Sequence, residues 1–168
     1  MKKKAVLLTT LFILSSLVSA CGCDGDRPSE VVIDLDALRI PCKQVSDFSE
    51  IPELVDEMKA TLEMYGGMGL AANQIGRQEA VCIMKFGDEP VIILVNPVIT
   101  QREGSQRDVE QCLSRPGIFI QVTRPREIHV KALDQYGNSM QYHFRGLEAR
   151  VACHEIDHLE GRLIIDYE

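Results

Sequence analysis

The sequence lacks an excess of basic residues. Its 168 residues contain 18 Lys and Arg against 25 Asp and Glu, which gives a formal net charge of -7 at pH 7. Nucleic acids and anionic membrane surfaces are themselves negatively charged, so a chain with this balance is a poor electrostatic partner for either. We therefore expect no nucleic acid among its partners.

The sequence also lacks internal repeats, low-complexity runs beyond its N-terminal part, and the length for two domains. Hydrophobic residues make up 45% of the chain and charged residues 26%, as in ordinary soluble globular proteins. A chain of this size can bury one sizeable core. We expect a single folded domain at residues 31–168.

The sequence also lacks an apolar segment of the usual length for a membrane-spanning helix. Lys2, Lys3 and Lys4 precede an uncharged, mostly apolar run at residues 5–18 that is short for a spanning helix. The run ends in Val18-Ser19-Ala20-Cys21, which resembles a bacterial lipobox, where a signal peptide is cleaved before a cysteine that carries lipid on its sulfur. This predicts a signal peptide at 1–20, a tether at 21–30 and a lipoprotein of the bacterial envelope, anchored to the membrane through Cys21. The alternative is an unused signal and a cytoplasmic protein.

The six cysteines would ordinarily suggest a disulfide framework in an exported chain. We do not predict one, because Cys21 has a lipidation role and Cys112 is a candidate metal ligand. The other four are predicted to be small buried apolar residues: Cys23, Cys42, Cys82 and Cys153.

Two helices are predicted from periodicity and stop signals. Apolar residues recur at helical spacing from Ile51 to Leu62, and Gly66 and Gly67 follow. A second helix is predicted at 147–160, ended by Gly161.

Strands are predicted from β-branched runs on either side of turn residues. One hairpin joins 80–86 to 91–100, a second joins 128–133 to 140–144, and a short terminal strand is expected at 163–165. Strands grouped around two helices, without regular alternation, predict an α+β fold with antiparallel sheets around the C-terminal helix.

The C-terminal helix carries the first chemical signal, His154-Glu155-Ile156-Asp157-His158. Histidines four residues apart lie on one face of a helix, so both rings can bind one metal ion. Glu155 is then placed to act as a general base. A metal site needs a third protein ligand, and Glu160 lies on the wrong face. We therefore expect the third ligand upstream, among Cys112, His129, His143 and several acids.

Three segments in order resemble the peptide deformylase family: GMGLAANQ at 67–74, EQCLS at 110–114 and HEIDHLEG at 154–161. The stretch at 38–42 also resembles the usual beginning of the family. The similarity covers roughly residues 31–167, and each motif stands where the chemistry needs it.

The resemblance implies roles for individual residues. The metal ligands would be Cys112, His154 and His158, with Glu155 as the catalytic acid and base. The side-chain amide of Gln74 and the backbone N–H of Leu113 would hold the developing oxyanion. The residues expected beside the substrate are Met68, Gly69, Gly117 and Val151. Gln111 and Arg115 depart from the usual family pattern, which affects the expected peptide specificity.

The implied activity is metal-dependent hydrolysis of the N-formyl group of N-formylmethionyl peptides, by a monomer that contains one divalent ion. The resemblance implies Fe(II), with Zn, Ni or Co as alternatives. Two other functions remain open: an anchored metal-binding lipoprotein without turnover, and an amidase for other N-formyl substrates. A zinc endopeptidase is disfavoured, because the downstream ligand is missing.

Asp157 lies between the two histidines and is expected to be buried, where an unpaired carboxylate is costly. Arg124 and Arg126 are its candidate partners, and the resemblance to the family favours Arg124. His129 and His143 lie in expected strands and are interpreted as ordinary surface or edge histidines.

Overall fold

A computed structural model describes residues 27–167. The predicted signal peptide, the lipidation site at Cys21, Cys23 and most of the predicted tether lie outside the described residues. In the part that is described, no helix combines the length and the apolar character that crossing a membrane requires.

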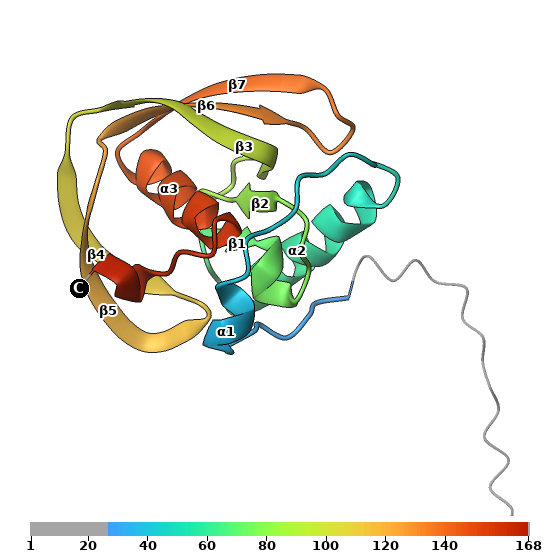
Figure 1. The fold of residues 1–168 in the computed structure, drawn as a ribbon, viewed down its shortest axis with the longest axis horizontal. Coiled ribbons are helices and arrows are strands. Elements are labelled where there is room, and N and C mark those ends of the chain that lie inside the picture. The colour runs from blue at the N-terminus through green and yellow to red at the C-terminus, as the bar shows by residue number, and fades with distance from the viewer. Residues whose placement is uncertain (1–26, 168) are drawn as a thin grey trace, which may run out of the picture.

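The described chain contains helices and short 3-10 turns at both ends and strands between them (Figure 1). The helical elements are α1 (Leu35–Leu38), α2 (Ile51–Tyr65), η2 (Ala72–Ile75), α3 (Leu147–Leu159) and η3 (Ile164–Tyr167). The strands are β1 (Gly69–Ala71), β2 (Val81–Met84), β3 (Ile92–Glu103), β4 (Gln106–Cys112), β5 (Arg115–Arg124), β6 (Glu127–Leu133) and β7 (Ser139–Arg145).

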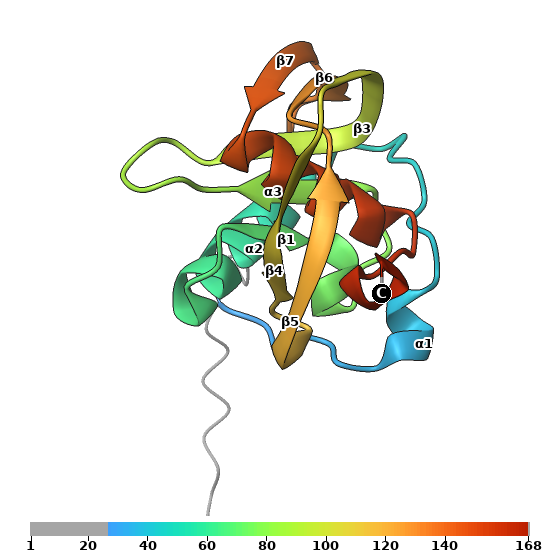
Figure 2. The ribbon, with the colours of Figure 1, turned by 90° about the vertical axis from the view of Figure 1, so that its left-hand side faces the viewer.

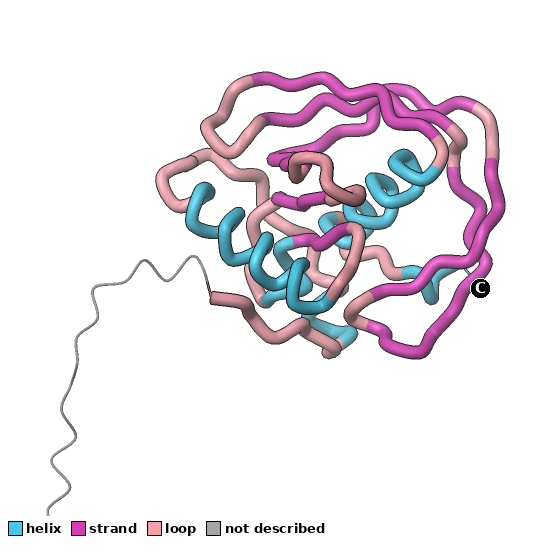
Figure 3. The backbone as a smooth tube through the Cα atoms, turned by 180° about the vertical axis from the view of Figure 1, so that it is seen from behind, coloured by secondary structure: helices cyan, strands magenta, loops and turns pink. Residues whose placement is uncertain are grey.

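The strands form two antiparallel sheets. Five strands pair in the order β1-β2-β3-β6-β7, while β4 and β5 form a separate hairpin. Both sheets curve around α3, which runs through the middle of the molecule (Figures 1 and 3). The predicted α+β fold around a central helix is confirmed.

Strand β2 lies between helices α2 and α3, and this position explains why its sequence is apolar throughout. Val81 and Ile83 pack in the core cluster of α2, whereas Cys82 and Met84 pack in that of α3. Because successive strand residues point to opposite faces, a strand covered on both faces needs no polar side. β1 and β2 therefore form the middle layer between α2 and α3.

The predicted helices and both predicted hairpins are confirmed, within a few residues at their ends. Helix α2 ends at Gly66, whose φ of 70° suits a residue without a side chain. The predicted strand at 163–165 is wrong, because the chain forms the turn η3 there. Asp166 closes that turn: its N–H donates to the Leu163 carbonyl at 3.0 Å and its carboxylate accepts from the Leu163 N–H at 2.9 Å.

The β4–β5 hairpin stands in front of α3 when the molecule is turned by 90° (Figure 2). Its strand β4 ends at Cys112, one of the candidate metal ligands.

The N-terminal end of the described chain is hydrogen-bonded to α2 and η2. The Ser29 N–H donates to the Thr61 hydroxyl of α2 at 2.9 Å, and the Val32 N–H donates to the Gln74 carbonyl at 2.7 Å.

Candidate active site

Helix α3 places three ionisable side chains of the HEIDH motif inside the protein. His154, Glu155 and His158 are 8%, 4% and 1% exposed. Their burial follows from the position of α3, which packs against β1, β2, β5 and β7. The two imidazole rings lie one helical turn apart with centroids separated by 5.0 Å. The spacing of the motif thus brings both rings to one face, as the sequence predicts.

Cys112 joins them from the last position of β4. Its Sγ lies 3.1 Å from Nε2 of His158, and the candidate ligand atoms of Cys112, His154 and His158 all lie within 4.8 Å of one another. His129 and His143, which the sequence left open as ligands, lie directly opposite each other on β6 and β7. Their rings stack on one another with centroids 4.2 Å apart, and they take no part in this cluster.

A backbone N–H three residues earlier in the chain orients the Gln74 side chain, so that its amide nitrogen faces Cys112. The Ala71 N–H donates to Oε1 of Gln74 at 2.9 Å. This fixes the orientation of the amide, and Nε2 lies 3.5 Å from Sγ of Cys112 and 3.2 Å from the Ser114 hydroxyl. Leu113 follows Cys112 directly, so its backbone N–H borders the same region. A Cβ added to Gly67 would lie 3.0 Å from Cδ1 of Leu113, which shows that the GMGLAANQ segment lies against the β4–β5 turn.

Glu155 lies against β1 at its glycine. A Cβ on Gly69 would overlap the Glu155 carboxylate, so only glycine leaves room for that side chain. Burial raises the pKa of Glu155 to about 7, despite the opposing effect of His154. Among the described residues, Oε2 of Glu155 has no hydrogen-bond partner. A buried carboxylate with a free oxygen and a pKa near neutrality can accept and return a proton.

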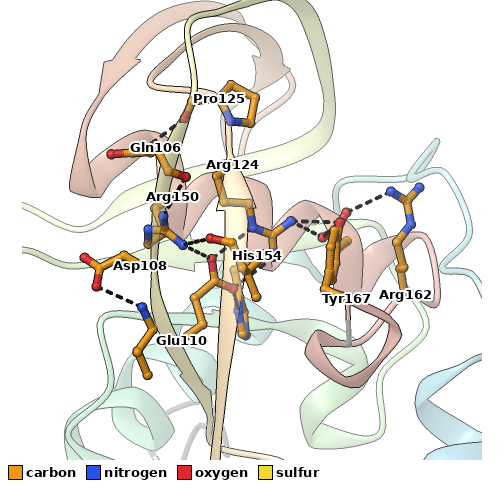
Figure 4. A network of polar contacts seen from close by, with 12 residues as sticks. Gln106, Asp108, Glu110, Arg124, Pro125, Arg150, His154, Arg162 and Tyr167 are labelled. Atoms are coloured by element: carbon orange, nitrogen blue, oxygen red, sulfur yellow. Dashed lines mark hydrogen bonds and ion pairs between the residues drawn. The ribbon is translucent and has the colours of Figure 1, made fainter.

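The sequence analysis missed the role of Glu110 on β4, which connects His154 to two buried arginines, Arg124 and Arg150 (Figure 4). Its carboxylate accepts from Nδ1 of His154 at 3.0 Å, from Nη1 of Arg150 at 2.7 Å, and from Nε and Nη2 of Arg124 at 2.9 and 3.0 Å. Burial alone would raise the pKa of Glu110, but the hydrogen bonds from His154 and Arg124 lower it to about 2. Glu110 is therefore an ionised acceptor that orients the His154 ring.

The predicted pairing of Asp157 with Arg124 is confirmed. Nη1 of Arg124 donates to Oδ2 of Asp157, and both side chains are buried. Arg126, the alternative partner, is exposed.

The residues predicted to contact the substrate lie on several different elements, unlike the three candidate metal ligands, which form one cluster. Gly69 lies beside Glu155, Val151 lies on α3 one turn before the first histidine, and Met68 is 48% exposed. Gly117 is exposed on β5 with a φ of 79°, in the left-handed region that favours glycine. A cavity of about 580 Å³ lies elsewhere, beside Phe86 and Tyr142, and none of the predicted site residues lines it.

Comparison with known proteins agrees with this geometry. Residues 30–167 match the sequence profile of the family described as Polypeptide deformylase. The chain is 45% identical over 130 residues to a peptide deformylase of Caldicellulosiruptor bescii, covering 77% of this chain and 78% of that protein.

The chain belongs to the peptide deformylase family. The crystal structure of peptide deformylase from Thermus thermophilus superimposes with a TM-score of 0.81 at 36% identity, over 83% of this chain and 85% of that one. The peptide deformylase from Thermotoga maritima gives a TM-score of 0.80 at 33% identity, over 84% and 97%. The predicted family and the predicted metallohydrolase class are thereby confirmed.

Peptide deformylases use a divalent metal, and the donor atoms of this chain fit one. A thiol and two imidazoles converge in a buried position, a set that suits borderline divalent ions such as iron, nickel and zinc. His154 turns Nδ1 toward Glu110, which leaves its Nε2 for a metal. The polar lining thus divides into atoms that could bind an ion and atoms that hold these candidate ligands in place.

Proposed function

We propose that the chain hydrolyses the N-formyl group of N-formylmethionyl peptides and releases formate, with Cys112, His154 and His158 as the metal ligands. The observation that carries the proposal is the convergence of these three residues, with the buried Glu155 next to His154 on the same helix. Metal binding alone would need no buried carboxylate next to the ligands, nor an amide held toward them. This favours a deformylase over a metal-binding lipoprotein without turnover.

A divalent metal bound there would supply Lewis-acid activation of water and of the formyl carbonyl. The protein supplies the proton handling: Glu155 takes a proton from the attacking water and delivers it to the leaving nitrogen. Nε2 of Gln74 and the N–H of Leu113 stabilise the developing oxyanion, and Ala71 fixes the Gln74 amide for that task. We propose Fe(II) as the ion, with zinc, nickel or cobalt as alternatives.

The methionine side chain of the substrate is proposed to bind near Met68 and Val151, with the peptide backbone along Gly69 and Gly117. The exposed Met68 suits an entrance, and the buried Val151 suits the apolar wall of a pocket. Gln111 is exposed on β4, and Arg115 pairs with Cys112 across the turn of the hairpin. Both are therefore placed to change which peptides are accepted. Every residue assigned a role lies on one chain, so we propose that a monomer suffices.

The test is formate release from formyl-Met-Ala-Ser by anaerobically prepared protein lacking residues 1–20, loaded in turn with iron, nickel and zinc. Glu155→Ala should keep its metal and lose nearly all turnover, because Glu155 moves protons and binds no metal. Glu148→Ala is the matched control, since Glu148 is an exposed acid on the first turn of the same helix. Cys112→Ala should lose the metal. No formate from any loaded, folded form would refute the activity, and metal loss from Glu155→Ala would refute the assignment of roles.

We further propose that the chain is a lipoprotein of the bacterial envelope, cleaved before Cys21 and anchored by lipid on that cysteine. The basic residues, the apolar run and the lipobox-like sequence support this. The enzyme would then meet exported formyl peptides or other N-formyl amines. Fractionation of Cys21→Ser beside Cys23→Ser, with mass spectrometry of the N-terminus, tests it. An uncleaved, unmodified wild-type chain in the cytosol would exclude the anchor.

A further inference from the structure

Arg124 occupies the centre of the polar network behind the candidate metal site (Figure 4). It is 4% exposed, and its Nε and Nη2 form a two-point contact with Glu110, the acceptor for His154. Its remaining edge, Nη1, contacts Asp157 and the Tyr167 hydroxyl. The orientation of Arg124 therefore fixes Glu110, and Glu110 fixes the His154 ring.

Tyr167, on η3 at the C-terminal end of the described chain, closes that edge. Its hydroxyl accepts from Nη1 of Arg124 at 2.9 Å and donates to Oδ2 of Asp157 at 2.7 Å. Its ring also lies under the guanidinium, with Cζ of Arg124 at 4.6 Å from the ring centroid. One side chain thus contacts both Arg124 and Asp157, and Asp157 stands between the two histidine ligands on α3.

We propose that Tyr167 is a positioning residue for the metal centre: its hydroxyl locks Arg124 and Asp157 in one arrangement and thereby holds His154 in the geometry that binds the ion. The inference rests on the metal site of the proposed function. Tyr167 touches neither the candidate ligands nor Glu155 by any hydrogen bond of the described residues. Its effect reaches the site through Arg124 and Glu110, and through Asp157 on the helix that carries both histidines.

The hydroxyl rather than the ring carries this role. Without the hydroxyl, Nη1 of Arg124 and Oδ2 of Asp157 each lose one fixed partner, on the side of the network that the half-buried Tyr167 covers. Water can satisfy both groups there, but it does not hold them in one geometry. The ring would still pack under the guanidinium. Removing only the hydroxyl should therefore loosen the ligand cage while the fold persists.

The experiment compares Tyr167→Phe with wild type, both stripped of metal and titrated with cobalt(II). We expect the cobalt dissociation constant to rise about tenfold, the lower end of the range for residues that support metal ligands. The visible absorption bands of the cobalt form should also shift, because they report ligand geometry. Tyr136→Phe is the matched control: Tyr136 is 68% exposed and outside the network, so its variant should match wild type.

A merely structural tyrosine would give a different pattern. If Tyr167→Phe lowered the melting temperature but left the cobalt affinity and spectrum as in wild type, the inference would be overturned. Tyr167→Leu, which also removes the ring, should weaken cobalt binding no less than Tyr167→Phe does. A wild type that binds no cobalt would overturn the proposed function together with this inference, whereas a wild type that binds it isolates the effect of the hydroxyl.

Discussion

Glu110→Gln is the substitution with the clearest consequence, because it changes one charge and almost no volume. The Glu110 carboxylate accepts four hydrogen bonds, from Arg124 twice and from Arg150 and His154 once each. A glutamine keeps one acceptor oxygen but turns an NH2 group toward donors. Arg150 then loses its negative partner and Arg124 keeps only Asp157, although both guanidinium groups are buried, at 4% exposed for Arg124 and 6% for Arg150.

The magnitude follows from burial. Breaking a buried ion pair by removing one partner costs about 3–5 kcal/mol, and the surviving oxygen places this case near the lower value. For a domain of this size, 1 kcal/mol corresponds to about 2–4 °C in melting temperature. The melting temperature of Glu110→Gln should thus fall by about 6–12 °C relative to wild type. The protein should still fold, because domain stabilities are about 5–15 kcal/mol.

Thermal unfolding of chelator-treated protein, followed by circular dichroism, measures this without a contribution from bound metal. Glu127→Gln is the matched control, because Glu127 also accepts from a histidine and an arginine, His143 at 2.9 Å and Arg145 at 3.0 Å. That cluster lies at the surface, where such pairs contribute little. Equal melting temperatures for Glu110→Gln and Glu127→Gln would refute the reasoning from burial.

Three further substitutions test other parts of the site and fold. Gly69→Ala should push the Glu155 carboxylate away and lower turnover by about 10²-fold at unchanged metal content, measured by formate release and metal analysis. Gln74→Met should lower kcat by about 10²–10³-fold with little change in cobalt affinity, because it removes an oxyanion donor; an unchanged kcat would exclude that role. The hydrogen bonds from Arg39 hold the pKa of Asp166 below its ordinary value. The stabilisation from this pair is therefore present above the ordinary pKa and is lost as the pH falls through the lowered one. Asp166→Asn should flatten this acid limb in unfolding curves taken from pH 6 to pH 2, and an unchanged limb would exclude the contribution of this pair.

Elements with strong local signals were predictable from sequence. Helix α2 has a helical stripe and a glycine stop, and each confirmed hairpin has β-branched strands around a turn. The terminal strand was predicted wrongly because a short apolar run, Leu163 to Ile165, is ambiguous between strand and turn. Its conformation depends on Asp166, which bonds back to Leu163.

The β4–β5 hairpin escaped prediction because β4 has no apolar pattern. Of its seven residues only Glu110 and Cys112 are buried, so its inward face is polar. The signal lay in β5, where Ile120, Val122 and Arg124 alternate on the buried face. An arginine in line with two apolar residues requires a buried acid nearby, and β4 pairs with β5 so that Glu110 is close.

The candidate ligands were predictable from their motifs, but the side chains that orient them were not. The contacts of Glu110 with His154 and Arg150 join residues 44 and 40 positions apart, and local periodicity carries no information on such distances. Arg150 also donates to the Val122 carbonyl at 3.1 Å and to the Gln106 carbonyl at 3.1 Å, which fastens both strands of the hairpin to α3. This attachment, with the contacts of Glu110 to His154 and of Arg124 to Asp157, holds the hairpin that carries Cys112 against the helix of the histidines.

The charges of the network explain how such a polar helix can be buried at all. Arg124 and Arg150 carry two positive charges, and Glu110 and Asp157 carry two negative charges, each within hydrogen-bond distance of an opposite partner. Because these four charges cancel without the metal, the scaffold behind His154 does not depend on the ion for its electrostatic balance. On one side of α3, charged side chains are therefore neutralised by protein partners and fix the geometry, while the candidate ligand atoms of His154 and His158 beside them need no such partner to be buried.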